Sequence, residues 1–337
     1  MSGEATVSAP GKTILFGEHA AVYGHPALVT ALDHRMTVTA RRSASLERGT
    51  VRLEIPALRI AKTVPSTPPL RTVREPGDLA LLAIAFATAD LGSKLAGFHL
   101  RVESTIPSGS GFGSSAALAV AVVAACRSAF ESDLAPEEIA RLALEVERLQ
   151  HGRASGVDVQ AVLRGGALWC RRSEIGALEC EELPSSATLD AFQLFHSGAP
   201  SETTGEMVDA VRRLNDREPA RVREAFASIE SATRDGRAAL IGGGDGATLV
   251  PIVRRAQAAL ETLDVVPAGV LRAIRAIEAD GGAAKISGAG GRSGRGAGLV
   301  LVVHPDPLWH ARFQPPAGWI SDNVRLGAEG LRTEVAA

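Results

Sequence analysis

The segment most suited to chemistry is a run of glycines and serines that precedes a long stretch of small residues. It reads Pro107-Ser108-Gly109-Ser110-Gly111-Phe112-Gly113-Ser114-Ser115-Ala116-Ala117. Glycines let backbone amides approach an anion closely, and a helix N-terminus adds unpaired N–H groups and a favourable dipole. Serine hydroxyls can reach a phosphate or a metal. We therefore predict a polyphosphate-binding loop, and the simpler alternative is a tight turn before a packed helix.

Two commoner phosphate-binding patterns do not fit this sequence. The dinucleotide pattern would require glycine where Ser114 stands. The Walker pattern would require glycine at Thr6, five positions before Gly11-Lys12-Thr13. The loop is therefore neither of these two types.

A second glycine-rich segment lies near the end of the chain, between two predicted strands. It reads Lys285-Ile286-Ser287-Gly288-Ala289-Gly290-Gly291-Arg292-Ser293-Gly294-Arg295-Gly296. Its first glycines would bring the backbone close to a ligand, and Arg292 and Arg295 would pair with phosphate. The alternative is a long hairpin loop without a ligand.

Together with two further segments, these loops resemble, in the same order, the motifs of the GHMP small-molecule kinases. Similarity extends from residue 7 to about 303. Within the family, the first and third of the four segments are most similar to the mevalonate kinases. In chain order the segments are Ala9-Pro10-Gly11-Lys12 with Leu15–Gly24, residues 107–117, residues 151–158, and residues 287–291.

The resemblance implies an α+β protein with the GHMP kinase fold. An N-terminal lobe at residues 1–185 would resemble domain 2 of ribosomal protein S5 and bind ATP. A C-terminal lobe at 186–337 would be ferredoxin-like. The implied reaction transfers the γ-phosphoryl group of ATP to the 5-hydroxyl of mevalonate, with both substrates in the cleft between the lobes.

Four side chains carry the implied catalysis. Asp158 would take the proton of the alcohol or orient its hydroxyl, and Lys12 would pair with Asp158 and favour the alkoxide. Glu147 precedes Asp158 by eleven residues, the spacing between metal ligand and catalytic aspartate in similar kinases. Glu147 and Ser115, chosen narrowly over Ser114, are thus the expected Mg²⁺ ligands.

The remaining predicted site residues bind the two substrates. The nucleotide-binding set is Pro107, Gly109, Ser110, Gly111, Gly113, Ser114 and Gly290. The acceptor-binding set is Glu18, His19, Val22, Ser197, Gly198 and Thr203.

The sequence departs from the family pattern in two places. His196-Ser197 stands where Asp-Thr is usual before the glycine of the acceptor segment, defined here as residues 196–204. Five residues, 292–296, are inserted between the third motif and the strand that follows it. The first departure keeps open an acceptor other than mevalonate, either another small alcohol or a sugar. The second would add phosphate contacts from its arginines or simply lengthen the loop.

Hydrophobic patterning predicts the elements that position these groups. Alternation indicates strands at 5–9, 36–40, 51–55 and 98–102, with further strands around 159–170, 191–195, 283–286 and 298–303. Residues 62–77, with four prolines, are typical of a loop. Helices are predicted at 78–91, 114–130, from Pro136 onward, 206–239 and 250–279.

Composition limits the classes of protein. The 337 residues carry a net charge of −2 and 13 aromatic side chains, which argues against a nucleic-acid-binding module. No apolar run is long enough to span a bilayer, and the N-terminus lacks a signal-peptide core. Three cysteines without a C-x-x-C pair predict reduced thiols and a cytoplasmic protein. Similar kinases are often homodimers.

Overall fold

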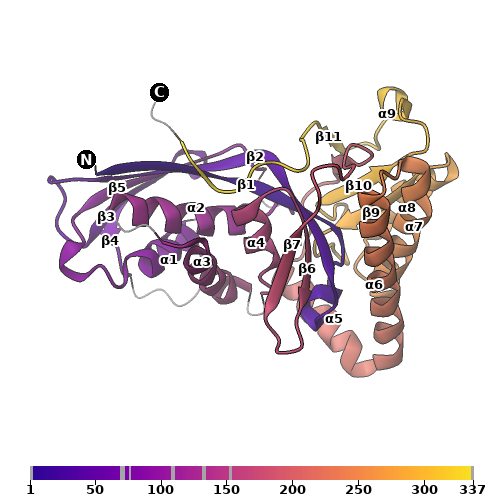
Figure 1. The fold of residues 1–337 in the computed structure, drawn as a ribbon, viewed down its shortest axis with the longest axis horizontal. Coiled ribbons are helices and arrows are strands. Elements are labelled where there is room, and N and C mark those ends of the chain that lie inside the picture. The colour runs from indigo at the N-terminus through magenta and orange to yellow at the C-terminus, as the bar shows by residue number, and fades with distance from the viewer. Residues whose placement is uncertain are drawn as a thin grey trace.

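Long alternating segments near the N-terminus build the larger of two sheets (Figure 1). The computed structural model describes residues 3–68, 73–75, 77–107, 111–130, 134–151 and 154–334. In this part of the chain the strand order is β12-β1-β2-β5-β3-β4, and β6 and β7 extend the sheet beside β2. The strands are β1 (Glu4–Phe16), β2 (Ala27–Arg42), β3 (Thr50–Ile55), β4 (Ile60–Pro65), β5 (Phe98–Ser104), β6 (Ala167–Arg172), β7 (Leu178–Glu182) and β12 (Arg332–Thr333).

The pair β1 and β2 connects the outer part of this sheet to the lobe junction. Their antiparallel register runs from Glu4 opposite Arg41 to Phe16 opposite Leu28, with two irregularities. One end of β2 pairs with β5 and the other with β6. Lys12 and Ile14 of β1 therefore lie where the sheet approaches the second lobe.

Helices cover one face of this sheet (Figure 1). α2 is buried along nearly its whole length, between the sheet and its neighbouring helices. Alanine and valine predominate in it because larger side chains would hold the packed layers apart. The helices are α1 (Asp78–Thr88), α2 (Ser114–Ala129), α3 (Pro136–His151) and α4 (Val157–Arg164).

The second lobe is a smaller antiparallel sheet with strand order β11-β8-β10-β9, packed against long helices. Segregated helices and sheets of this kind confirm the predicted α+β class. The strands are β8 (Gln193–His196), β9 (Ala283–Ser287), β10 (Leu299–Val303) and β11 (Ile320–Asp322). The helices are α5 (Thr204–Arg217), α6 (Pro219–Ile241), α7 (Gly246–Thr262), α8 (Ala268–Ala279) and α9 (Trp309–Arg312).

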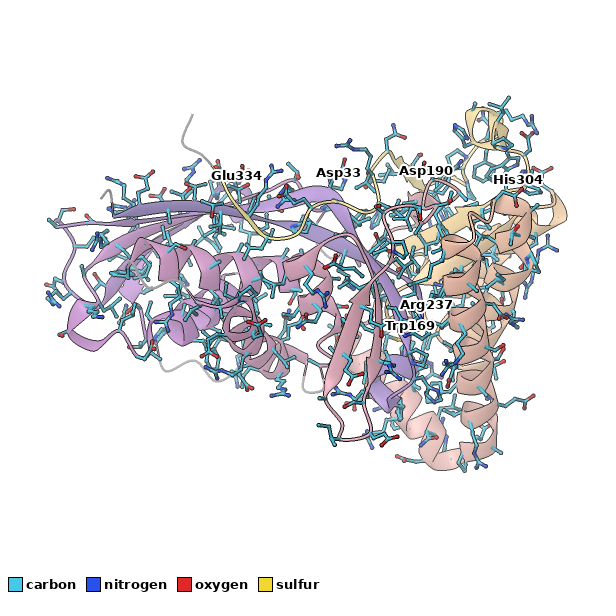
Figure 2. All side chains as sticks on the ribbon, viewed as in Figure 1. Asp33, Trp169, Asp190, Arg237, His304 and Glu334 are labelled. Atoms are coloured by element: carbon cyan, nitrogen blue, oxygen red, sulfur yellow. A yellow bond between two sulfur atoms is a disulfide. The ribbon has the colours of Figure 1, made fainter. Side chains whose placement is uncertain are left out.

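Contacts between residues distant in the sequence join the lobes. The guanidinium of Arg237 on α6 lies 5.0 Å from the ring centroid of Trp169 on β6, and Figure 2 shows the two side chains together. Arg237 also donates to Glu181 of β7 at 3.0 Å. At the other end, Glu334 accepts a hydrogen bond from Ser8 of β1 at 2.5 Å, where the chain has returned to the first sheet.

Three predictions of secondary structure are wrong in part. Residues 159–164, the first part of the strand expected around 159–170, belong to α4, which lies between left-handed Gly156 and Gly165. The predicted loop at 62–77 begins inside edge strand β4, where Pro65 is tolerated because an edge residue needs no ladder donor. The two long helices predicted at 206–239 and 250–279 each divide into two, as α5–α6 and α7–α8.

The prediction of three reduced cysteines is also wrong. Cys170 and Cys180 form a disulfide, and Cys126 is free and buried. The bonded residues face each other across β6 and β7, a pairing that sequence spacing did not reveal. The expected reduced cysteines therefore no longer support a cytoplasmic location, which stays a prediction. Among the described residues, no helix combines the length and apolarity that a bilayer span requires.

Candidate active site

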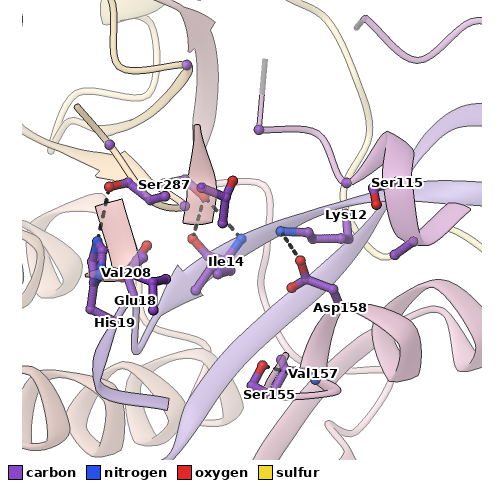
Figure 3. Close-up of a pocket in the computed structure, with 18 of the residues that line it drawn as sticks. Lys12, Ile14, Glu18, His19, Ser115, Ser155, Val157, Asp158, Val208 and Ser287 are labelled. Atoms are coloured by element: carbon purple, nitrogen blue, oxygen red, sulfur yellow. Dashed lines mark hydrogen bonds and ion pairs between the residues drawn. The ribbon is translucent and has the colours of Figure 1, made fainter. Parts of the chain in front are cut away.

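A cleft of about 550 Å³ lies between the lobes (Figure 3). Its walls come from β1, the N-termini of α2 and α4, the end of α3, the acceptor segment and the glycine loop, defined here as residues 288–298. The segments that the sequence singled out therefore meet in one place.

Lys12 and Asp158 form an ion pair inside this cleft. Lys12 Nζ lies 2.9 Å from Asp158 Oδ2, and Figure 3 shows the two side chains pointing toward each other. The lysine is only 5% exposed, whereas the aspartate side chain is 34% exposed. A Cβ atom on Gly113 would lie 2.6 Å from the Lys12 side chain, so the glycine leaves the space that the lysine stem occupies. The ammonium is thus held beside an accessible carboxylate.

Glu147 is a third titratable group at the cleft. Its side chain comes from α3 and is buried. Burial and the nearby charge of Asp158 together raise its pKa to about 8, and Lys12 acts in the opposite direction. A buried carboxyl of this kind would be ionised by a bound cation.

The N-terminus of α2 points its first residues at the same space. Gly111, Gly113, Ser114 and Ser115 line the cleft. Ser115 donates its hydroxyl proton to Gln150 Oε1, which leaves the oxygen lone pairs free to accept. Pro107 lies outside the lining residues, and Gly109 and Ser110 lie outside the described residues.

These groups fit a magnesium ion. Glu147 and Ser115 supply oxygen donors, which Mg²⁺ prefers, and the ion commonly keeps water and phosphate oxygens as its other ligands. The described residues contain no cluster of three or more His, Cys, Asp or Glu side chains suited to a metal. A site with few protein ligands is thus the kind that the residues present would form.

Glu18 lines the cleft but forms a buried ion pair with Lys285 of β9. Lys285 also donates to the carbonyl of Ile286 at 2.8 Å. Burial raises the pKa of Glu18 and lowers that of Lys285, while each charge opposes the effect on its partner. The sequence prediction gave Lys285 no role, although a lysine inside a buried strand was the available signal.

His19 connects the first motif to the glycine loop. Its Nε2 lies 3.0 Å from the carbonyl oxygen of Ala289. Burial lowers its pKa to about 4, so the ring is neutral near pH 7 and donates this bond. The residue has a left-handed φ of 59°, and Val22 in the following turn also lines the cleft.

The predicted acceptor residues of the second lobe separate into two groups. Ser197 is buried and bonds to Gly298 O at 2.8 Å and Ala297 N at 3.0 Å, and neither it nor Gly198 is among the lining residues. Thr203 lines the cleft and also caps α5 by a reciprocal pair of hydrogen bonds with Glu206.

The glycine loop reaches the cleft with its first residues, 288–290, and its last residues, 297 and 298, but not with the residues between them. Gly290 lines the cleft, and its φ of 67° and close approach to Val265 O exclude a side chain there. Arg292 and Arg295 are exposed and lie outside the lining residues. Glu202, absent from the predicted set, lines the cleft from the acceptor segment.

Comparison with known proteins agrees with this geometry. Residues 78–166 match the model of the GHMP kinases N-terminal domain. The mevalonate kinase of Archaeoglobus fulgidus is 33% identical over 84% of this chain and 88% of its own length. That of Thermococcus sibiricus is 30% identical over 97% of each chain. The chain belongs to the GHMP kinase family.

Solved structures extend the match to the whole fold. The mevalonate kinase of Methanococcus jannaschii superposes with a TM-score of 0.71 over 98% of both chains, at 20% sequence identity. The GHMP kinase fold predicted from the motifs is thereby confirmed. As a member of this family the protein is an ATP-dependent phosphotransferase with an alcohol as acceptor.

Proposed function

We propose that this protein is a mevalonate kinase, which forms 5-phosphomevalonate and ADP from mevalonate and ATP. The observation that carries the proposal is the Lys12–Asp158 ion pair, which faces the N-terminus of α2 within one cleft. The nearly full-length similarity to curated mevalonate kinases supports the choice of acceptor.

Phosphoryl transfer depends mainly on positioning and on neutralising charge. Backbone amides at Gly111 and Gly113, with the hydroxyl of Ser114, would hold the phosphates at the N-terminus of α2. Gly288 and Gly290 also line the cleft and would let the triphosphate pass close to the backbone.

The acceptor hydroxyl would lie between Asp158 and the γ-phosphate. The accessible Asp158 carboxylate would accept the hydroxyl hydrogen bond and take the proton as the new bond to phosphorus forms. Lys12 Nζ would stabilise the negative charge on the alcohol oxygen. Glu18, His19 and Thr203 would form the rest of the acceptor pocket.

Glu147 and Ser115 would hold Mg²⁺ at the phosphate side of the cleft. The ion, when bound, would neutralise charge on the β- and γ-phosphates. Because Glu147 is buried beside Asp158, its carboxyl needs a nearby cation to remain ionised, and this supports its assignment as a ligand.

An acceptor panel tests the proposal against another alcohol or a sugar. ADP release from Mg·ATP should increase strongly with R-mevalonate. It should stay near the acceptor-free rate with galactose, homoserine or phosphomevalonate. Turnover with one of these other alcohols and none with mevalonate would contradict the assigned acceptor while preserving the kinase.

A further inference from the structure

The two segments that depart from the family pattern contact each other in the folded protein. The acceptor segment leads from β8 into α5, and residues 292–296 lie in the glycine loop between β9 and β10. Ser197 joins their bases through its bonds to Ala297 and Gly298. Gly298 N donates in return to Gly198 O at 2.9 Å.

Glu202 makes the outer connection between the same segments. Its Oε2 accepts from the Arg292 amide at 3.2 Å. Its Oε1 accepts from the Ser293 amide at 3.1 Å and from the Ser293 hydroxyl at 2.6 Å. One carboxylate therefore satisfies three donors of the inserted residues.

Missing side chains allow this close approach. A Cβ atom on Gly294 would lie 2.2 Å from Ser201 Oγ, and one on Gly296 would lie 2.3 Å from Gly198 O. A Cβ on Gly291 would lie 3.2 Å from Glu202 Oε2. The inserted residues thus follow the acceptor segment closely along its length.

The negative charge of Glu202 strengthens its hydrogen bonds to the inserted residues near neutral pH. The hydrogen bond from Ser293 is the largest of the effects that lower the pKa of Glu202, and backbone N–H groups act in the same direction. A hydrogen bond to an ionised acceptor is stronger than one between neutral groups. The carboxylate form is therefore the one that holds the loop.

The connected segments contact different substrates in the proposed mechanism. Gly288, Ala289 and Gly290 line the cleft just before the inserted residues, and the proposed mechanism assigns Gly288 and Gly290 to the triphosphate. Thr203, immediately after Glu202, lines it on the acceptor side. A ligand that fixes one segment would reduce the freedom of the other.

We propose that Glu202 is a positioning residue that couples nucleotide binding to acceptor binding by fixing the glycine loop against the acceptor segment. The inference rests on the proposed function, because it takes ATP and mevalonate as the two ligands. It assigns the insertion at 292–296 a role in communication between subsites. Phosphate contact by the exposed arginines is not required.

Equilibrium binding measures the coupling directly. The Kd of R-mevalonate is determined with and without Mg²⁺ and the β,γ-imido analogue of ATP. We expect the analogue to tighten mevalonate binding about fivefold or more in the wild type, and less than about twofold in Glu202→Gln. The reciprocal experiment, the Kd of the analogue with and without mevalonate, must give the same factor.

Two further variants make the result specific. Ser293→Ala removes one donor and should lower the coupling to an intermediate value. Combined with Glu202→Gln it should add little, because both changes break the same contact. Asp209→Asn is the matched control, since this exposed carboxylate on α5 pairs with Arg212 of its own helix and should retain the wild-type factor.

Hydrogen exchange gives a readout that needs no substrate. The amides of Arg292 and Ser293 should exchange faster in Glu202→Gln than in the wild type, while amides within α2 should be unchanged. Equal coupling factors in wild type and Glu202→Gln, or equal exchange at both amides, would overturn the proposal. Absence of coupling in the wild type would do the same.

The proposed function can fail separately. A wild-type protein that neither binds nor phosphorylates mevalonate would refute the assigned acceptor, and coupling would then be measured with the alcohol that the panel identifies. Should Glu202→Gln not fold, as judged by its thermal unfolding, Ser293→Ala carries the test. In that case an undiminished coupling factor overturns the inference.

Discussion

Two lysine–carboxylate pairs at the cleft differ in their exposure to solvent. Asp158 remains accessible beside Lys12, so its carboxylate can meet a substrate. Glu18 and Lys285 are both buried and neutralise each other. The first pair suits chemistry, whereas the second fixes the junction between β9 and the loop that follows β1.

Breaking the buried Glu18–Lys285 pair should destabilise the fold. Lys285→Met leaves the Glu18 carboxyl buried without its cation, so we expect a loss of about 3–5 kcal/mol in the free energy of unfolding. Urea denaturation at pH 7 measures it. The double variant Glu18→Gln/Lys285→Met should recover a large part of the loss, and no recovery would contradict the unpaired charge as its cause.

His19 should make stability depend on pH. Its pKa is about 4 in the folded protein and near 6.5 in the unfolded chain. Between about pH 4 and pH 6.5 the unfolded chain therefore carries a proton on His19 that the folded protein does not. The contribution of neutral His19 to the free energy of unfolding is complete above about pH 6.5. It falls by about 3 kcal/mol as the pH is lowered to 4.

The variant His19→Asn isolates this effect, because asparagine has no side-chain group that titrates between pH 7 and pH 4. Urea unfolding between pH 7 and pH 4 should show a smaller loss of stability in the variant than in the wild type. Parallel losses in both proteins would refute a buried, neutral His19.

Among the elements, those with an unambiguous local pattern were predicted best. The run of small residues at 114–130 indicated a buried helix, and α2 is a buried helix over that run. The segment around 159–170 was predicted to begin as a strand, but residues 159–164 belong to α4. The buried side chains of Val157 and Ala161 are four residues apart and form one helical face. Short apolar segments cannot settle that choice by period alone.

The hairpin of β6 and β7 carries the disulfide that the sequence interpretation missed. Protein purified without reductant and then denatured should show one reactive thiol, from Cys126, and three after reduction. Reduction should lower the free energy of unfolding by about 2–3 kcal/mol, because the unfolded chain loses a cross-link. Three reactive thiols before reduction would show that the bond is absent.

Across the whole molecule, the site depends on contacts that no local pattern contains. The motifs predicted that Lys12 and Asp158 would meet, because the family resemblance supplied their common role. The Glu18–Lys285 pair joins the two lobes, and the Glu202–Ser293 contact joins two loops of the second lobe that lie far apart in the sequence. The domain division at residue 185 stays a proposal, and β12 returns from the chain's end to the first sheet.

The central claim is that Asp158 and Lys12 act on the hydroxyl of mevalonate. The most direct measurement is mevalonate-dependent ADP release by the wild type and by Asp158→Asn, which has nearly the same shape but no basic carboxylate. We expect kcat to fall about 10²–10⁴-fold, with a much smaller change in the KM for ATP. A kcat within about threefold of the wild type, in a folded variant, would contradict the account.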